Sequence, residues 1–340
     1  MIRKAIKKLF QKQDLSQEEM KQVMTEIMEG QVSEVLISAF LTALRMKGET
    51  ADEITGGAYV MREKAEKVNI SNEYTIDTCG TGGDGANTYN ISTTVAFVAA
   101  AAGIKVVKHG NRSVSSKSGS ADVLEKLGVN INLTPEEVKE CVKNTSLGFM
   151  FAPNFHKAMK YAVPVRKELK ERTIFNVLGP LTNPAFAKGQ VLGVFDESLT
   201  EIIASALKNL GLERALVVYG MDKLDEISSC NNTKITELNN GEIQTYYISP
   251  KDFGMPLYDS CEIKGGTVEE NANIIKELLQ NKLKGAKYDI LLLNAGAALY
   301  VGKKAENIRE GVYLAKDIIE SGKAFEKLNQ FIEFTNKFKK

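Results

Sequence analysis

Four glycines fall within six positions of this sequence, from Gly80 to Gly85, directly after a short β-rich run. Glycine lets the backbone turn tightly and bring bare N–H groups close to a phosphate. Asn90-Ile-Ser-Thr93 follows and leads into an alanine-rich stretch typical of a helix, with Ser92 as its expected N-cap. The free N–H groups and hydroxyls at a helix N-terminus attract an anion. This part of the chain therefore predicts two consecutive anion-binding features, the glycine-rich loop and the helix N-terminus that follows it.

A second polar stretch, residues 108–122, holds three cations, five serines and an asparagine. Its donors suit a polyanion such as pyrophosphate, although serine-rich stretches are also often solvated loops. It follows a predicted parallel strand, and open α/β sheets bind ligands at the carboxyl ends of such strands, which favours a binding role. We expect the two histidines of the chain, His109 and His156, to line the site, and neither is assigned as a base.

The glycine-rich loop has two other interpretations. Gly80, Gly82 and Gly85 match G-x-G-x-x-G, the pattern of a dinucleotide site. Against that site, no helix follows at once, and the next strand ends in Lys108 where a ribose-binding acid would be expected. A P-loop motif is absent. A tight turn without any ligand remains the alternative for the loop taken alone.

The secondary structure expected from the sequence changes near residue 70. Before it, helical periodicity runs throughout, and Ser16 with Glu19 and Thr50 with Glu53 form capping boxes that start helices. After it, short β-rich runs alternate with helical stretches. The expected strands after the first are 105–108, 190–195, 215–219 and 289–294, and the expected helices lie near 93–103, 120–127, 135–144, 198–210 and 268–283.

We therefore predict an α/β fold. A small N-terminal helical domain, residues 1–70, precedes a larger α/β domain, residues 71–340, with a mostly parallel central sheet. Four short helices cannot bury two apolar faces each, so the helical domain should pack on the rest of the chain or on a second copy. The stretch 153–184 lacks clear strands, and helices from it are expected to join the helical domain.

The composition excludes several classes of protein. Lys and Arg (44) nearly balance Asp and Glu (43), so no basic excess marks a nucleic-acid or anionic-membrane partner. The longest apolar run, 91–102, is too short to span a bilayer, and no apolar signal-peptide core is found. The four cysteines are scattered, so structural zinc and a disulfide framework are not expected. We expect a cytoplasmic protein without nucleic-acid or membrane partners.

A series of motifs, in order and at compatible spacing, resembles the anthranilate phosphoribosyltransferase family over nearly the whole chain. The motifs are Cys79-Gly-Thr-Gly-Gly-Asp84, Asn90-Ile-Ser-Thr93, Lys108-His-Gly-Asn-Arg112, Ser115-Ser-Lys-Ser-Gly-Ser-Ala-Asp122, Phe151-Ala-Pro153, Pro164-Val-Arg166, Arg172-Thr-Ile-Phe-Asn176, Gly179-Pro-Leu-Thr-Asn-Pro184, Leu224-Asp-Glu-Ile-Ser228 and Leu293-Asn-Ala-Gly-Ala-Ala-Leu-Tyr300.

The resemblance implies a fold of the nucleoside phosphorylase/phosphoribosyltransferase type, usually a homodimer through the helical domain. It implies transfer of the phosphoribosyl group of 5-phosphoribosyl 1-pyrophosphate to the amine of anthranilate, a step of tryptophan biosynthesis. It also implies Mg²⁺ as cofactor, with two ions per monomer, and it leaves open whether anthranilate synthase is a further partner.

The resemblance assigns site residues but no catalytic acid, base or nucleophile. It implies that Ser92, Asp225 and Glu226 organise the metal. Anthranilate would meet Gly80, His109, Asn111 and Arg166. Phosphoribosyl pyrophosphate would be held by Gly80, Gly82, Gly83, Asp84, Thr88, Asn90, Ile91, Ser92, Thr93, Lys108, Asn111, Arg112, Ser115, Ser116 and Ser120.

Two positions depart from the family pattern. Lys157 stands where proline is frequent, and Lys223 replaces a common glycine just before the acid pair, where it bears on metal affinity. Two alternatives stay open at this point. One is a pyrimidine nucleoside phosphorylase, which resembles the family in fold, and the other is a non-catalytic relative that binds nucleic acid.

Overall fold

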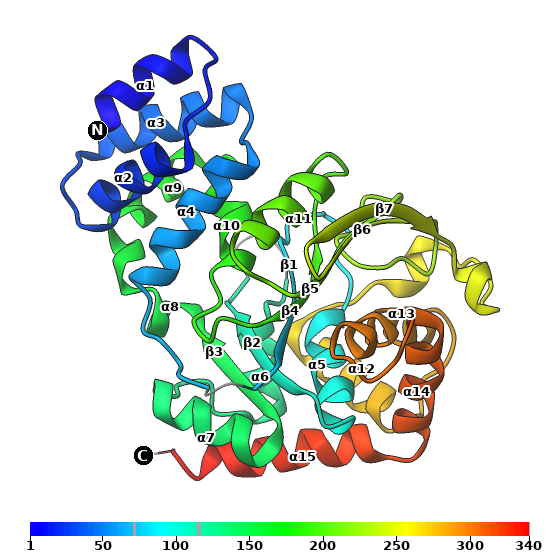
Figure 1. Ribbon diagram of the computed structural model, residues 1–340. Helices are drawn as coiled ribbons and strands as arrows, with labels where there is room; N and C mark the ends of the chain where they lie inside the picture. The colour runs from blue at the N-terminus through cyan, green and yellow to red at the C-terminus, as the bar shows by residue number, and fades with distance from the viewer. Residues whose placement is uncertain (71–72, 114–116, 340) are drawn as a thin grey trace.

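The computed structural model describes residues 1–70, 73–113 and 117–339. A helical bundle comes first in the chain and a layered α/β unit follows it (Figure 1). The bundle contains α1 (Ile2–Phe10), α2 (Gln17–Met28), α3 (Glu34–Lys47) and α4 (Ala51–Glu63). Both predicted capping boxes are confirmed, at the starts of α2 and α4.

A seven-stranded sheet forms the centre of the α/β unit, in the order β3-β2-β1-β4-β5-β6-β7. Strands β1 to β5 are parallel, and β6 and β7 continue the sheet as an antiparallel hairpin. The predicted mostly parallel sheet is therefore confirmed. The strands are β1 (Thr75–Gly80), β2 (Lys105–Gly110), β3 (Leu147–Phe151), β4 (Gly189–Gly193), β5 (Arg214–Gly220), β6 (Thr233–Asn239) and β7 (Glu242–Ile248).

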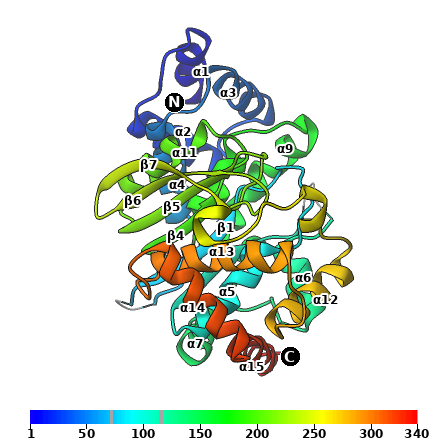
Figure 2. The same ribbon diagram turned by 90° about the vertical axis from the view of Figure 1, so that its right-hand side faces the viewer.

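Helices cover both faces of the sheet, as the edge-on view in Figure 2 shows. Alternate side chains of β5 enter different cores, because successive residues of a strand point to opposite faces. Leu216 and Val218 join one core, and Ala215 and Val217 join the other. The first core is covered by α5 (Ile91–Ala101), α6 (Ser120–Leu127), α7 (Pro135–Thr145), α12 (Val268–Leu279), α13 (Ala286–Val301), α14 (Ile308–Glu320) and α15 (Lys323–Asn336).

The second core joins the helical bundle to the sheet. It runs from the inner faces of α1 to α4, through α9 (Val163–Leu169), α10 (Phe175–Leu181) and α11 (Leu199–Asn209), to β4 and β5. Together with α8 (Ala152–Phe155) and the 3₁₀ turn Lys157–Tyr161, the helices from 152–181 form one returning segment, and its α9 and α10 pack on α3 and α4. The bundle therefore buries the inner apolar faces of its helices on the rest of its own chain.

Two expectations about the elements are wrong. Residues 289–294 lie inside α13, not in a strand; nearly every side chain of this helix is buried, and an apolar run buried on all sides has no amphipathic period. Ser92 is not the N-cap of α5, because the helix begins at Ile91 with Asn90 before it. Strands β3, β6 and β7 were not predicted. Within the described residues, no helix is both long and apolar enough to cross a bilayer.

Arg62 fixes the helical bundle to the ends of two other helices. Its Nε donates to the Leu181 carbonyl at 2.6 Å, and its Nη1 donates to the Leu210 carbonyl at 3.4 Å. These carbonyls lie at the C-terminal ends of α10 and α11, where a cation is favourable. The side chain is 7 % exposed, and burial lowers its pKa to about 10.

Arg62→Met should therefore lower the free energy of unfolding by about 2 kcal/mol, because it leaves both buried carbonyls without a charged donor. Denaturant unfolding measures this loss. Arg45→Met is the control, since Arg45 is about half exposed and lies 4.0 Å from its nearest acid. Equal stability of the two variants would contradict the role given to Arg62.

Candidate active site

The site lies at the carboxyl end of the sheet, where a glycine ends both β1 and β4. Gly80 and Gly193 are partners in the parallel register. A methyl group on Gly80 would lie 2.3 Å from Asp225 Oδ2, and one on Gly193 would lie 1.5 Å from the Asp225 carbonyl oxygen. Neither position has room for a side chain. The paired glycines therefore let the loop after β5 lie directly on the sheet.

The glycine-rich loop is held in place by its own backbone and by Asp225. The Thr81 N–H donates to the Gly193 carbonyl at 2.9 Å, and the Phe195 N–H donates to Thr81 Oγ1 at 3.0 Å. The Gly82 N–H donates to Asp225 Oδ2 at 2.7 Å, with a φ of +67° that favours glycine. The loop and the acid pair thus form one structure.

Asp225 and Glu226 place two neighbouring carboxyl groups in a partly buried position. Burial raises the pKa of Asp225 to about 7, and the neighbouring Asp84 adds to this rise. Burial and the Asp225 carboxylate raise the pKa of Glu226 well above its usual value. The Lys108 charge acts in the opposite direction on the pKa of Glu226, and so does a hydrogen bond from the Ser92 N–H to Glu226 Oε1 at 3.2 Å. Neighbouring carboxylates in such a position attract a cation.

The donor set fits magnesium. Among the described residues, no three His, Cys, Asp or Glu side chains converge as they would in a preformed metal cage. Magnesium, however, usually takes one or two carboxylates and completes its shell with substrate phosphates and water. Asp225 and Glu226 match that pattern, with Ser92 beside them through its backbone N–H, which donates to Glu226.

Lys108 brings a positive charge to the same place. It is 3 % exposed, and its Nζ donates to the Thr78 carbonyl and, at 3.3 Å, to Ser92 Oγ. Burial lowers its pKa, while the nearby Asp77 and Glu226 carboxylates act in the opposite direction. The N-terminus of α5, Lys108 and the acid pair therefore meet around Ser92.

The first turn of α5 differs in detail from what was expected. The Ile91 and Thr93 side chains are buried, so Ile91 can meet a ligand only through its backbone. Asn90 Nδ2 donates to the Ser118 carbonyl at 3.0 Å, which ties this turn to the start of α6. Thr88 forms an isolated antiparallel bridge with Lys264.

The basic loop after β2 is only partly described, since Ser115 and Ser116 lie outside the described residues. Arg112 Nη1 forms ion pairs with Asp122 at 2.9 Å and with Glu125 at 2.6 Å, so its charge is already paired. The Ser120 hydroxyl donates to the Asn111 carbonyl at 3.3 Å. Asn111 and Ser120 therefore lie together, whereas Arg112 is held by acids of α6.

Arg166 lies on α9 in the returning segment. Its guanidinium stands 5.4 Å from the ring centroid of Phe175 and is mostly buried, which lowers its pKa. In the part of the chain that the structure describes, no carboxylate forms an ion pair with it. A buried guanidinium without an acid partner is suited to bind a carboxylate ligand in a planar, two-pronged contact.

The two histidines pack against each other. Their ring centroids are 5.0 Å apart, and both side chains are 8 % exposed. Burial lowers the pKa of His109 to about 3 and that of His156 to about 4, so both rings are neutral at neutral pH. They can shape a site but cannot supply the positive charge that a carboxylate ligand needs.

Sequence reasoning missed Gly193 and Asp77. Asp77 is fully buried; its Oδ2 accepts from Asn183 Nδ2 at 2.7 Å, and its Oδ1 accepts from the His109 N–H at 3.3 Å. An acid in the middle of a short predicted strand was the available signal for Asp77. Lys223, the position where the family has glycine, has a φ of +71°, which explains why glycine is favoured there.

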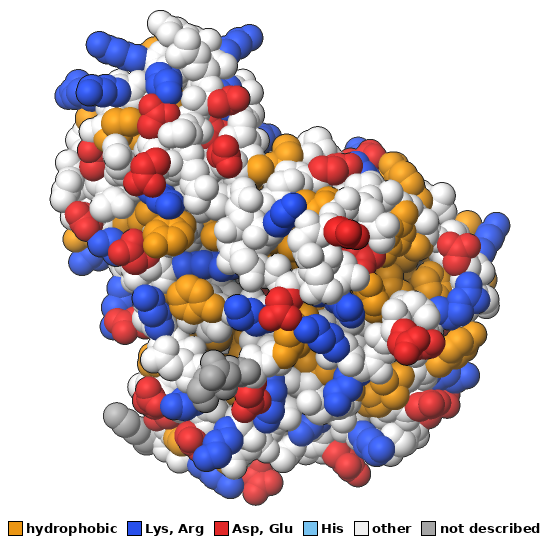
Figure 3. All heavy atoms as spheres, viewed as in Figure 1, with side chains coloured by type: hydrophobic (Ala, Val, Ile, Leu, Met, Phe, Trp, Pro, Cys, Tyr) orange, Lys and Arg blue, Asp and Glu red, His pale blue; other side chains and the backbone are white. Residues whose placement is uncertain are grey.

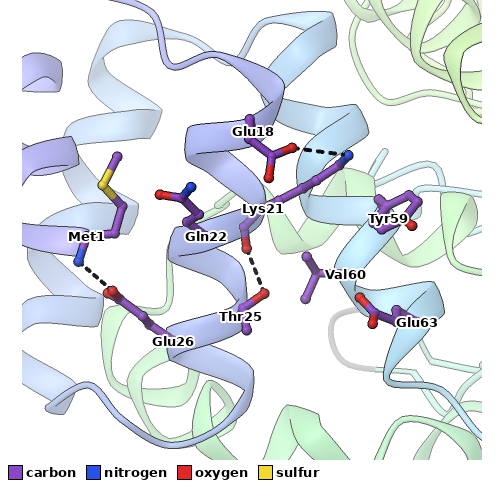
Figure 4. A pocket seen from close by; sticks show the side chains of 9 residues that line it. All are labelled: Met1, Glu18, Lys21, Gln22, Thr25, Glu26, Tyr59, Val60 and Glu63. Carbon is purple, nitrogen blue, oxygen red and sulfur yellow. Dashed lines mark hydrogen bonds and ion pairs between the residues drawn. The ribbon is translucent and has the colours of Figure 1, made fainter.

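A hollow of about 570 Å³ lies elsewhere, between α2 and α4 (Figure 4). Lys21 pairs with Glu18 at 3.5 Å and stands 4.3 Å from the Tyr59 ring centroid, so its charge already has partners. Basic and acidic side chains are also interspersed over the face drawn in Figure 3, without a dominant patch of one sign. Neither feature competes with the end of the sheet as the main site.

Comparison with known proteins matches both parts of the chain to one family. Residues 72–325 match the glycosyl transferase family, a/b domain, and residues 3–65 match its helical bundle domain. A relative from Alkaliphilus metalliredigens, named anthranilate phosphoribosyltransferase, is 58 % identical over 339 residues, with all of both chains covered.

Two solved structures are similar to this one. The anthranilate phosphoribosyltransferase from Thermus thermophilus superimposes with a TM-score of 0.92 at 42 % identity, covering 98 % of this chain and 99 % of that one. The Saccharomyces cerevisiae enzyme, solved in complex with PRPP and Mg, gives a TM-score of 0.91 at 29 % identity, covering 99 % of this chain and 98 % of that one.

Replacing Asp225 with asparagine should stabilise the metal-free protein and, at the same time, remove a metal ligand. Asp225→Asn should raise the free energy of unfolding in EDTA at pH 8 by roughly 1–2 kcal/mol, because it keeps an acceptor for the Gly82 N–H and removes a buried like charge. Mg²⁺ with pyrophosphate should raise the melting temperature of the native protein but not that of the variant.

Thermal unfolding with and without the metal checks both effects. The exposed Asp317→Asn on α14 is the control and should respond as the native protein does. Equal stabilisation of native protein and Asp225→Asn by Mg²⁺ and pyrophosphate would rule out Asp225 as a metal ligand.

Proposed function

This chain belongs to the anthranilate phosphoribosyltransferase family, and we propose that it transfers the phosphoribosyl group of 5-phosphoribosyl 1-pyrophosphate to the amine of anthranilate at the end of its sheet. The observation that carries the proposal is the meeting of glycine-loop amides, Lys108 and the buried Asp225–Glu226 pair around Ser92. The names of the relatives support this transferase rather than the phosphorylase or nucleic-acid-binding alternatives.

The donor substrate would occupy the sites expected from the sequence, with two adjustments. Ile91 would contribute its backbone alone, and Arg112 would first have to leave its ion pairs. The N–H groups of the glycine-rich loop and of the first turns of α5 and α6 supply donors for phosphate oxygens. Lys108 adds the charge that a pyrophosphate requires.

Ser92, Asp225 and Glu226 are the residues that would hold Mg²⁺, and we propose two ions per monomer, shared with the substrate. When bound, the metal supplies positive charge against the departing pyrophosphate. Of the protein groups, Lys108 would do the same from beside Ser92, since its Nζ lies within hydrogen-bond distance of Ser92 Oγ.

The acceptor would lie on the side of the returning segment. Arg166 would bind the carboxylate of anthranilate, with Asn111, Gly80 and the neutral His109 around it. The bond from ribose C1 to pyrophosphate breaks, a bond from C1 to the amine nitrogen forms, and that nitrogen releases one proton. A neutral arylamine attacks without a strong base, so orientation is the main contribution of these residues.

We further propose the assembly and location expected from the family. The helical domain (residues 1–70 with the helices of 153–184) and the α/β domain (71–340) would pair with a second copy through the helical domain. Exposed apolar side chains on α1 and α3, among them Phe10, Val35 and Met46, support this. We propose anthranilate synthase as a further partner, and a cytoplasmic location consistent with four free cysteines.

Loss of anthranilate fluorescence on mixing both substrates with Mg²⁺ tests the function. Arg166→Ala should raise the KM for anthranilate about 10-fold or more, with a smaller change for phosphoribosyl pyrophosphate, because one charged contact is worth about 1.5–3 kcal/mol. The exposed Arg309→Ala should behave as the native enzyme.

Asp225→Ala/Glu226→Ala should abolish turnover at every Mg²⁺ concentration, because both carboxylate ligands are lost. The same fluorescence assay measures this, and circular dichroism checks that the double variant is folded. If this variant and Arg166→Ala both matched the native enzyme, the site assignment would be wrong.

A further inference from the structure

Arg172 connects the acceptor-side segment to the glycine-rich loop. It lies between α9 and α10, and its Nη2 donates to the Gly83 carbonyl. Its guanidinium stacks on Phe195, with Cζ 4.2 Å from the ring centroid. A hydrogen bond and a stacked ring thus fix this side chain, although the residue is exposed.

Both partners of Arg172 belong to the machinery that shapes the loop. The Phe195 N–H donates to Thr81 Oγ1, and Gly83 follows Gly82, whose N–H donates to Asp225. Gly83 has a φ of +78°, and a methyl group there would meet Arg172 Nη2 at 3.4 Å. Arg172 therefore touches the loop where it turns and the strand extension that holds the loop.

The other end of the connection is the segment that carries Arg166. Arg172 lies in a short connection between two helices. Lys170 is the C-cap of α9, and Thr173 comes just before α10. The Thr173 N–H donates to Asn176 Oδ1 at 2.9 Å, which fixes the start of α10. Phe175, two residues later, lies against the Arg166 guanidinium. The backbone that carries Arg172 thus leads, within three residues, to the ring against which Arg166 lies.

Within the described residues, Arg172 forms no ion pair with an acidic side chain. In residues 1–70, 73–113 and 117–339, no carboxylate lies within ion-pair distance of it. Asp196 is near enough for the guanidinium to contribute to its lowered pKa, after the hydrogen bonds from Ser198, which are the main cause. An arginine that only stabilised the surface would be expected to pair with such an acid. Arg172 donates to a backbone carbonyl of the phosphate-binding loop.

We propose that Arg172 is a positioning residue that couples the two substrate sites. Through Gly83 it links the conformation of the donor loop to the segment that presents Arg166. A pyrophosphate that orders the loop would then order the carboxylate-binding arginine, and an acceptor bound at Arg166 would order the loop. Linkage requires both effects to have the same size. This inference rests on the proposed function.

Calorimetric titration of anthranilate, with and without magnesium pyrophosphate, tests the coupling without turnover, because pyrophosphate carries no ribose. In the native protein, magnesium pyrophosphate should lower the Kd for anthranilate on the order of 5- to 100-fold. Arg172→Met keeps the length of the side chain and removes its donors, so this ratio should fall to about 1. The Kd for anthranilate alone and the melting temperature should stay close to native values.

Two further variants sharpen the test. Lys167→Met removes an exposed charge from α9 and should keep the native ratio. Arg172→Lys keeps a donor without the planar stack and should retain part of the coupling. A native ratio in Arg172→Met, or a ratio of 1 in the native protein, overturns the inference. So does a large fall in melting temperature together with weak binding at both sites, since Arg172 would then be structural.

The same titrations distinguish a failure of the coupling from a failure of the proposed function. If the native protein binds neither magnesium pyrophosphate nor anthranilate, the proposed function fails and the coupling fails with it. If both bind independently of each other, only the coupling is wrong.

Discussion

The close approach of Asp225 to the sheet is the contact on which the site depends. The main chain of Asp225 can lie on the ends of β1 and β4 only because Gly80 and Gly193 face it without side chains. That approach brings Asp225 next to the glycine-rich loop, where it accepts a hydrogen bond from the Gly82 N–H, and Glu226 beside the N-terminus of α5, where it accepts one from the Ser92 N–H. The resulting burial of negative charge is unfavourable for folding alone, and it is what makes the position suitable for a metal and a pyrophosphate.

The two cores of the molecule support this arrangement in different ways. The core beneath α5 is apolar on almost every side of that helix, so the turn that carries Ser92 is fixed by packing. The other core extends from the sheet through α10 and α11 into the helical bundle, where Arg62 binds the ends of both helices. The donor loop and the acceptor-side segment are thus attached to opposite faces of one sheet.

Much of this could be predicted from sequence because the signals are local. The capping boxes at Ser16 and Thr50, the glycine-rich loop and the strand ending near Lys108 depend on neighbouring residues, and topology then brings parallel strand ends together. The family resemblance supplied the acid pair, whose role has no local signature. The run 289–294 was predicted wrongly because a fully buried helix and a buried strand both appear in the sequence as a continuous apolar run. Asn240-Gly241, with positive φ at both residues, was a usable signal for the β6–β7 hairpin. Gly193 and Arg172 could not have been found, because their importance arises from contacts with residues far away in the sequence.

The placement of Arg166 and Arg172 in one segment of short helices and connections has an evolutionary consequence. Helices α8 to α10 occupy about thirty residues that leave the sheet after β3 and return at β4. Substitutions within this returning segment could alter which nucleophile is accepted without disturbing the strands or the acid pair. Descendants of such a scaffold can therefore diversify their acceptors while inheriting one unchanged activated-sugar chemistry.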